Sequence, residues 1–242
     1  ECEIIDFKKI GNGLSLEGGD IFVINKNIVL IGISERTSKE AIDLIIPYIF
    51  DQAFEHVIAI DPEQSHLDYI EHQFNSSRQH MEQTVQLERG YFPKTINLDN
   101  YTVSAILISR VLHFLRGQEI TDLLRQAYHI LMPGGRIFIS TISPYIKLLS
   151  NHIETYEENE NSGGIEWPGE IADLRKYLPS RDHKHNQKFG HVLTPRVLSK
   201  HLEKVGFEIM TAEFSTRTYQ EITQMTDARY AGKEDTIVIG VK

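Results

Sequence analysis

The chain has 242 residues, enough for one large domain or two small ones, and its 40% hydrophobic and 24% charged residues are typical of a globular protein. Its 25 basic and 34 acidic residues leave a formal net charge of −9, so we expect no nucleic-acid partner and no membrane surface partner. Cys2 is the single cysteine, which excludes an internal disulfide and a cysteine-built metal site. No apolar run approaches the roughly 20 residues that cross a bilayer. We therefore expect a cytoplasmic protein, and because Glu1 rather than methionine opens the sequence, we expect the natural start to lie upstream.

The first strands of the chain are predicted to form a hairpin. Ile21–Asn25 and Ile28–Ile33 are apolar runs separated by Lys26-Asn27, as in a hairpin with a two-residue turn. A helix capped by Ser34 or Ser38 is expected to follow and to reach about residue 52, although Pro47 removes a backbone donor inside it.

Strands and helices then alternate as far as residue 139. Strands are expected over 56–60, 84–87, 103–108 and 136–139, and helices within 64–82 and over 118–131. The run 103–108 is apolar throughout, as in a strand covered on both faces. Pro133-Gly134-Gly135 is expected to end the second helix.

The periodic pattern is lost between about 143 and 192, where proline, glycine and charged residues dominate. A stretch of this kind predicts a lid or a binding loop, and its acidic run 154–160 predicts a solvated face. A helix is then expected from Pro195, capped by Thr194 and ended by Gly206, followed by strands over 207–210 and 235–241. The alternation favours an α/β fold with a mostly parallel sheet, helices on both faces and an antiparallel edge at the C-terminus.

Motifs of the second part resemble class I S-adenosylmethionine-dependent methyltransferases. They are the strand Val57-Ile-Ala-Ile-Asp61, the segment Ala105-Ile-Leu-Ile-Ser-Arg-Val-Leu-His-Phe-Leu115 and the turn Leu131-Met-Pro-Gly-Gly-Arg-Ile-Phe-Ile139, in the order that this family has. The resemblance covers about residues 57–242. It implies a Rossmann-like sheet, S-adenosylmethionine as cofactor and a small-molecule methyl acceptor.

The first part resembles a different family, the arginine deiminases. Leu16-Glu-Gly-Gly-Asp20 is followed by Val29-Leu-Ile-Gly-Ile-Ser-Glu-Arg-Thr37, and His66-Leu67-Asp68 stands at a plausible distance downstream. The resemblance implies that Glu17, Asp20 and Arg36 belong to a substrate pocket and that His66 moves protons. The family's reaction also needs a cysteine nucleophile, and no cysteine follows Cys2, so the sequence predicts against a working deiminase.

The chain therefore looks like two families joined near residues 50–70. We expect residues 1–27 to form an N-terminal hairpin or extension and residues 28–242 to form a methyltransferase-like domain. The deiminase-like segment would supply the first βαβ unit of that domain. The glycine-rich cofactor turn of the methyltransferases is then replaced by a segment in which Gly32 is the only glycine, which would weaken cofactor binding.

The candidate site residues follow from these resemblances. Asp61 is expected to accept the ribose hydroxyls of the cofactor, with the alternative that it is only a turn residue before Pro62. His113 is the candidate catalytic residue, with the alternative of a histidine packed beside Phe114. Tyr91 would stack on adenine or pack in its turn. The complete cofactor set is Gly32, Ser34, Asp61, Tyr91, Ser109 and Arg110.

No metal site is expected. His183, His185 and His191 form a weak ligand set, and a solvated loop is the simpler interpretation. Three functions remain: a methyltransferase acting on a small molecule, a catalytically inactive domain with the same fold, and guanidine hydrolysis, which the missing cysteine disfavours.

Overall fold

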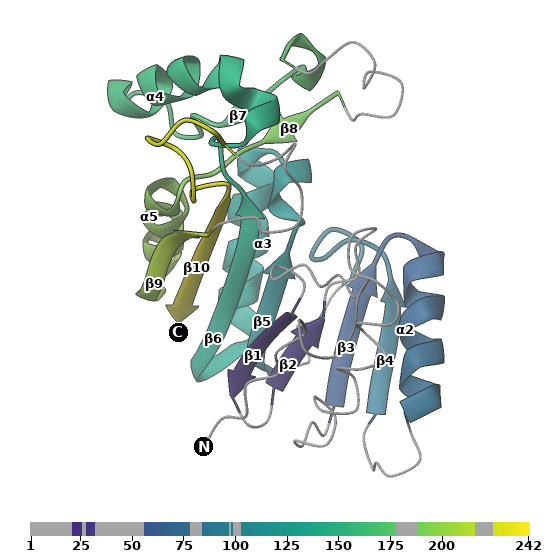
Figure 1. Ribbon diagram of the computed structural model, residues 1–242. Helices are drawn as coiled ribbons and strands as arrows, with labels where there is room; N and C mark the ends of the chain where they lie inside the picture. The colour runs from purple at the N-terminus through teal and green to yellow at the C-terminus, as the bar shows by residue number, and fades with distance from the viewer. Residues whose placement is uncertain are drawn as a thin grey trace. The chain divides into compact units, whose positions relative to one another are not determined.

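The computed structural model describes residues 21–25, 28–31, 56–77, 84–96, 98, 103–177, 188–215 and 225–242. The chain divides into two compact units, residues 1–96 and 97–242, called here the N-terminal unit and the C-terminal unit. Their elements are labelled in Figure 1. Among the described residues, no helix is both long enough and apolar enough to span a membrane.

The N-terminal unit contains two separate strand pairs. β1 (Ile21–Asn25) and β2 (Ile28–Ile31) pair antiparallel, which confirms the predicted strands. β3 (His56–Asp61) and β4 (Thr84–Arg89) pair in parallel and are connected through α2 (Gln64–Ser77), which packs against both strands. Leu67 of α2 is 1% exposed and anchors this packing. The helix predicted up to residue 52 lies outside the described residues.

The C-terminal unit is built on a four-stranded sheet in the order β5-β6-β10-β9 (Figure 1). The strands are β5 (Val103–Ser109), β6 (Leu131–Ile142), β9 (Glu208–Ser215) and β10 (Asp235–Val241). β5 and β6 run parallel, whereas β10 runs antiparallel to both of its neighbours. The α/β class and the antiparallel C-terminal edge are thereby confirmed.

Two amphipathic helices, α3 (Gly117–Ile130) and α5 (Pro195–Val205), pack together and against this sheet. α3 buries an apolar stripe, in which Ile120, Leu124 and Ala127 are fully inaccessible to solvent. α5 begins as predicted, with the Thr194 hydroxyl accepting a hydrogen bond from the Val197 amide at 3.4 Å. It ends at Gly206, whose φ of 121° suits glycine.

The Pro133-Gly134-Gly135 turn follows the helix as predicted but lies within the next strand. The helix already ends at Ile130, and the turn lies inside β6, where pairing with β5 jumps from Val103↔Leu131 to Ala105↔Arg136. Residues 132–134 are exposed, and Gly134 adopts a φ of 77°. The helix thus ends before this turn within one residue of the prediction, but the turn interrupts a strand, which begins at Leu131 and not at Arg136.

Residues 143–177 and 188–192 form an ordered region, called here the cap segment. It contains η4 (Lys147–His152), α4 (Ile153–Ser162), β7 (Glu170–Ile171), η5 (Leu174–Lys176) and β8 (Gly190–His191). Its own hydrophobic cluster consists of Ile146, Leu149, Tyr156, Ile171 and Val192. In Figure 1, α4, β7 and β8 lie beyond the carboxyl end of β6, which is the position expected of a lid over that edge of the sheet.

Candidate functional site

Asp61 lies at the carboxyl end of β3, as the sequence predicts, and its carboxylate is held in a fixed orientation. Oδ1 accepts a hydrogen bond from the Glu63 amide at 2.7 Å, and His66 Nδ1 lies 3.2 Å from the same oxygen. A carboxylate only accepts hydrogen bonds, so Nδ1 carries the proton in this contact. The Asp61 side chain remains 33% exposed.

Tyr91 follows β4 at the same edge of the N-terminal unit. Asp61 pairs with Arg89 in the parallel register, and the Gly90 amide donates to the Asp61 carbonyl at 3.2 Å. Tyr91 is 55% exposed, and its carbonyl accepts hydrogen bonds from the Thr95 and Ile96 amides at the start of a turn. The structure therefore brings together an oriented carboxylate and an exposed aromatic ring on adjacent strand ends.

The other residues predicted in the N-terminal part have different outcomes. Gly32, Ser34, Glu17, Asp20 and Arg36 all lie outside the described residues. His66 is on α2 and bonds to Asp61, so in this structure it orients the strand-end carboxylate.

Ser109 and Arg110 lie at the carboxyl end of β5 in the C-terminal unit. Ser109 is opposite Ser140, and the Arg110 amide donates to the Ser140 carbonyl at 2.9 Å. Arg110 has a φ of 55°, an uncommon conformation for a non-glycine residue, so the backbone turns sharply there. Its guanidinium Nη2 donates to Asp235 Oδ2 at 2.7 Å, and the two side chains are only 13% and 10% exposed. Arg110 thus connects the end of β5 to the start of β10, whatever else it binds.

His113 lies on η3 (Leu112–Phe114), a single turn that follows this edge. Its ring is half-buried and lies 3.9 Å from the Phe114 ring, between centroids, at an interplanar angle of 43°. This contact fits the packing alternative, but Phe114 is 51% exposed, so the pair is at the surface rather than in the core. The turn that carries His113 leads through Leu115 and Arg116 into α3.

Three other histidines of the C-terminal unit are buried, and burial lowers the pKa of each: His152, His191 and His201. His191 is completely inaccessible to solvent in β8, so its interpretation as part of a solvated loop is wrong. His183 and His185 lie outside the described residues. No group of three or more metal-ligating side chains occurs in the part of the chain that the structure describes.

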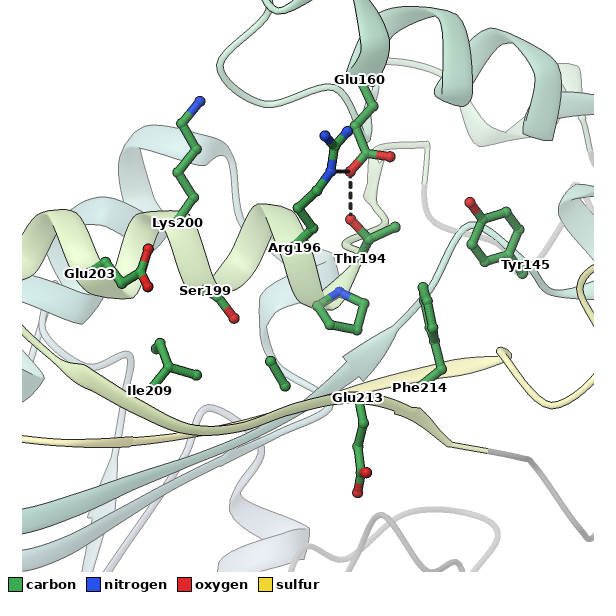
Figure 2. Close-up of a pocket in the computed structure, with 12 residues that line it drawn as sticks. Tyr145, Glu160, Thr194, Arg196, Ser199, Lys200, Glu203, Ile209, Glu213 and Phe214 are labelled. Carbon is green, nitrogen blue, oxygen red and sulfur yellow. Dashed lines mark hydrogen bonds and ion pairs between the residues drawn. The ribbon is translucent and has the colours of Figure 1, made fainter.

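A groove of about 720 Å³ runs along α5 and β9 in the C-terminal unit, and no predicted site residue is among those that line it. Its walls include Tyr145, Glu160, Arg196, Ser199 and Phe214. Figure 2 shows the Glu160 carboxylate held between the Arg196 guanidinium and the Thr194 hydroxyl, at 3.0 and 2.9 Å. Because Glu160 belongs to α4, this network fastens the cap segment to the start of α5. The predicted solvated face of α4 is thus partly engaged in structure.

Comparisons with known proteins give two kinds of match, one by sequence to the N-terminal part and one by fold to most of the chain. A family model described as arginine deiminase matches residues 3–102, which is less than half of the chain. An arginine deiminase from Listeria monocytogenes is 33% identical over 86 residues, covering 33% of this chain and 21% of that protein. One from Staphylococcus aureus is 40% identical over 63 residues, covering 23% of this chain and 15% of that protein. The chain thus spans about a fifth or less of the deiminases that it matches. The match ends near the boundary between the two units and beyond the junction expected at residues 50–70.

Solved structures with a similar fold are methyltransferases. An S-adenosylmethionine-dependent methyltransferase from Mesorhizobium loti has a TM-score of 0.53 and 16% identity, covering 82% of this chain and 85% of that one. One from Methanosarcina mazei has a TM-score of 0.51 and 13% identity, with the same coverages. The chain has the Rossmann-like fold of S-adenosylmethionine-dependent methyltransferases. Both predicted resemblances are therefore confirmed: the arginine deiminase resemblance by sequence similarity, and the methyltransferase resemblance by fold.

Sequence reasoning missed the residues that stabilise the segment following the carboxyl end of β5. Asp235 is 125 residues from Arg110, and Glu170 and His191 contact residues 115–117 from the cap segment. None of these contacts is marked by a local pattern, because each joins segments that are far apart in the sequence. Sequence reasoning does single out His191, but interprets it as part of a solvated loop.

Proposed function

We propose that the chain binds S-adenosylmethionine at the β3–β4 edge and transfers its methyl group to a small molecule. The observation that supports this most strongly is the adjacency of Asp61 and Tyr91 on two parallel strand ends, joined by the hydrogen bond from the Gly90 amide to the Asp61 carbonyl. Ligands of open α/β sheets bind beyond the carboxyl ends of the strands, where both residues lie.

The residues at this edge fit the nucleoside part of the cofactor. The Asp61 carboxylate has one oxygen fixed by the Glu63 amide, and the other can accept the ribose hydroxyls through charge-assisted hydrogen bonds. The exposed Tyr91 ring offers a flat surface on which adenine can stack. His66 keeps the carboxylate in one orientation, which lowers the entropic cost of binding.

When bound, the cofactor supplies an electrophilic methyl group on its sulfonium. The protein then mainly has to align a nucleophile with that group and exclude water. In this proposal His113 orients the acceptor or takes its proton, because an imidazole is a suitable base near neutral pH. In this proposal the cap segment, which lies beyond the carboxyl end of β6, selects the acceptor.

Two other functions lead to different results in the same assays. An inactive domain with this fold is favoured by the lack of a glycine-rich turn around Gly32 and by the engagement of Arg110 with Asp235. Guanidine hydrolysis is favoured by the deiminase match over residues 3–102, but it requires a thiolate nucleophile, for which this sequence offers Cys2 alone.

Titration calorimetry with S-adenosylmethionine tests the proposal. Asp61→Ala should weaken binding about ten- to a hundredfold, since a hydrogen bond to a charged group contributes roughly 1.5–3 kcal/mol. The affinity of Asp61→Asn should lie between those of the unmodified chain and Asp61→Ala. Asp68→Asn is the matched control, because Asp68 is an exposed acid on α2 whose carboxylate bonds to Gln64 instead.

Absence of binding by the unmodified chain at millimolar cofactor would refute the enzymatic proposal and leave the inactive domain. Release of citrulline or ammonia from arginine would support guanidine hydrolysis instead. Equal affinity in the unmodified chain and Asp61→Ala would show that the ribose binds elsewhere.

A further inference from the structure

One cross-strand pair of the cap segment forms hydrogen bonds with the junction between the His113 turn and α3. Glu170 of β7 and His191 of β8 are register partners in the antiparallel pair. Their side chains bond to opposite ends of the same three residues, Leu115 to Gly117, which connect η3 to α3. A single pair of side chains therefore holds both ends of this junction.

The two hydrogen bonds have defined directions. His191 Nδ1 lies 2.9 Å from the Leu115 carbonyl oxygen, and because a carbonyl only accepts, Nδ1 carries the proton and donates. The Gly117 amide donates to Glu170 Oε1 at 2.5 Å. That amide belongs to the first turn of α3, where no intrahelical acceptor exists, so Glu170 supplies an acceptor that the helix lacks.

Aromatic side chains of the cap segment surround the same junction. The Trp167 ring lies so close to Gly117 that a Cβ at this position would be 2.1 Å from its Cδ1 atom, so only glycine fits. The Arg116 guanidinium lies over the Phe189 ring at 4.8 Å from its centroid. Trp167 also contacts the edge of His191, at 5.3 Å between ring centroids. The junction is thus contacted by Trp167, Glu170, Phe189 and His191.

Burial favours the neutral form of His191, and the Leu115 carbonyl places its single proton on Nδ1. Its side chain is inaccessible to solvent, and within the described residues its Nε2 atom has no hydrogen-bond partner. A second proton would therefore have no acceptor there. Burial has the largest effect on the pKa of His191 and lowers it. Of the titratable groups that act on this pKa, Glu170 raises it and His201 lowers it.

We propose that Glu170 and His191 are positioning residues that couple the cap segment to the turn carrying His113. The proposal rests on the proposed function for the role of His113, whereas the coupling itself does not depend on any cofactor. The cap segment therefore fixes the position of the turn that carries the candidate catalytic residue.

Hydrogen exchange followed by mass spectrometry tests this coupling in the full chain without ligand. The amides of Phe114, Leu115 and Ile120 donate to Val111, Leu112 and Arg116 and report on the junction. In His191→Phe, which keeps a ring but lacks the donor, their protection should fall about tenfold, the effect of losing a hydrogen bond of about 1.4 kcal/mol. His191→Asn, whose amide can donate from nearly the same place, should restore it.

Glu170 provides an independent pair of variants. Glu170→Ala should lower protection in the first turn of α3, and Glu170→Gln, which keeps the acceptor oxygen, should not. His152→Phe is the control, because His152 is a buried histidine with no hydrogen-bond partner in the described part of the chain. It should leave the junction unchanged.

Unchanged protection in both His191→Phe and Glu170→Ala would overturn the coupling. A fall spread evenly over β6 and β10 would also overturn it, by showing a general structural role. If His191→Phe does not fold, the comparison of Glu170→Ala with Glu170→Gln decides. Calorimetry with S-adenosylmethionine on the unmodified chain separately tests the proposed function, so the two failures are distinguishable.

Discussion

Replacing Asp235 with alanine should destabilise the C-terminal unit strongly, because it deprives a buried arginine of its carboxylate. At the 2.7 Å separation of Arg110 Nη2 and Asp235 Oδ2, the gross Coulomb attraction is about 6 kcal/mol at an effective dielectric constant of about 20. Desolvation of the two charges offsets much of this attraction. Removal of one partner of a buried pair nevertheless costs about 3–5 kcal/mol, since the other charge stays buried. We expect Asp235→Ala to lose that much free energy of unfolding.

Urea unfolding followed by circular dichroism measures this loss as a shift of the midpoint at constant slope. Asp227→Ala is the matched control, because it breaks the Arg229–Asp227 pair, also 2.7 Å long but 73% and 38% exposed. Solvent screens such a surface pair, so its loss should change the free energy of unfolding very little. In a double-mutant cycle, Arg110→Met should recover much of the loss in Asp235→Ala. If Asp235→Ala costs no more than Asp227→Ala, Arg110 does not hold the sheet edge together and the reasoning fails.

Three further predictions concern the C-terminal unit. Gly117→Ala should lower the free energy of unfolding by about 1–3 kcal/mol or more, because the new methyl group displaces the Trp167 indole. The same displacement should shift the fluorescence of Trp167, the only tryptophan in the sequence, and an unchanged spectrum would contradict this. Burial lowers the pKa of His152, His191 and His201, so the unfolded chain binds protons that the native chain does not. The free energy of unfolding should therefore fall as the pH drops below about 6.5, by up to about 1.4 kcal/mol per pH unit for each histidine. Urea titrations between about pH 7.5 and 5.5 that show no dependence of this free energy on pH would refute the prediction. Tyr156→Phe should cost about 1 kcal/mol in urea unfolding, because its buried hydroxyl bonds to Thr194 at 3.0 Å, whereas a value near zero would show that this bond adds nothing.

The elements that the sequence predicted well are those specified by neighbouring residues. α5 is an example, since Thr194 caps it, Pro195 begins it and Gly206 ends it within twelve positions. β10 and the apolar stripe of α3 were equally predictable, because their periodicity is local. The strand end at Asp61 was found from the order of elements around it.

The cap segment was not predictable in the same way. Its strands are two residues long and its helix α4 is polar, so no window carries a periodic signal. It is held together instead by side chains that are far apart in the sequence, such as Ile146 and Val192 of its hydrophobic cluster. The bond between His191 and Leu115 spans 76 positions for the same reason. Such contacts depend on the folded topology and leave no mark on the local composition.

The most direct test of the central claim is to map where the nucleoside binds. Titration of the ¹⁵N-labelled chain with S-adenosylhomocysteine, the demethylated product, should shift the backbone amides around Asp61 and Tyr91, above all those of Glu63 and Gly90. The amides of Ser199 and Ala212, which line the groove along α5 and β9, should stay in place. Shifts confined to that groove, or none at millimolar ligand, would contradict a cofactor site at the β3–β4 edge.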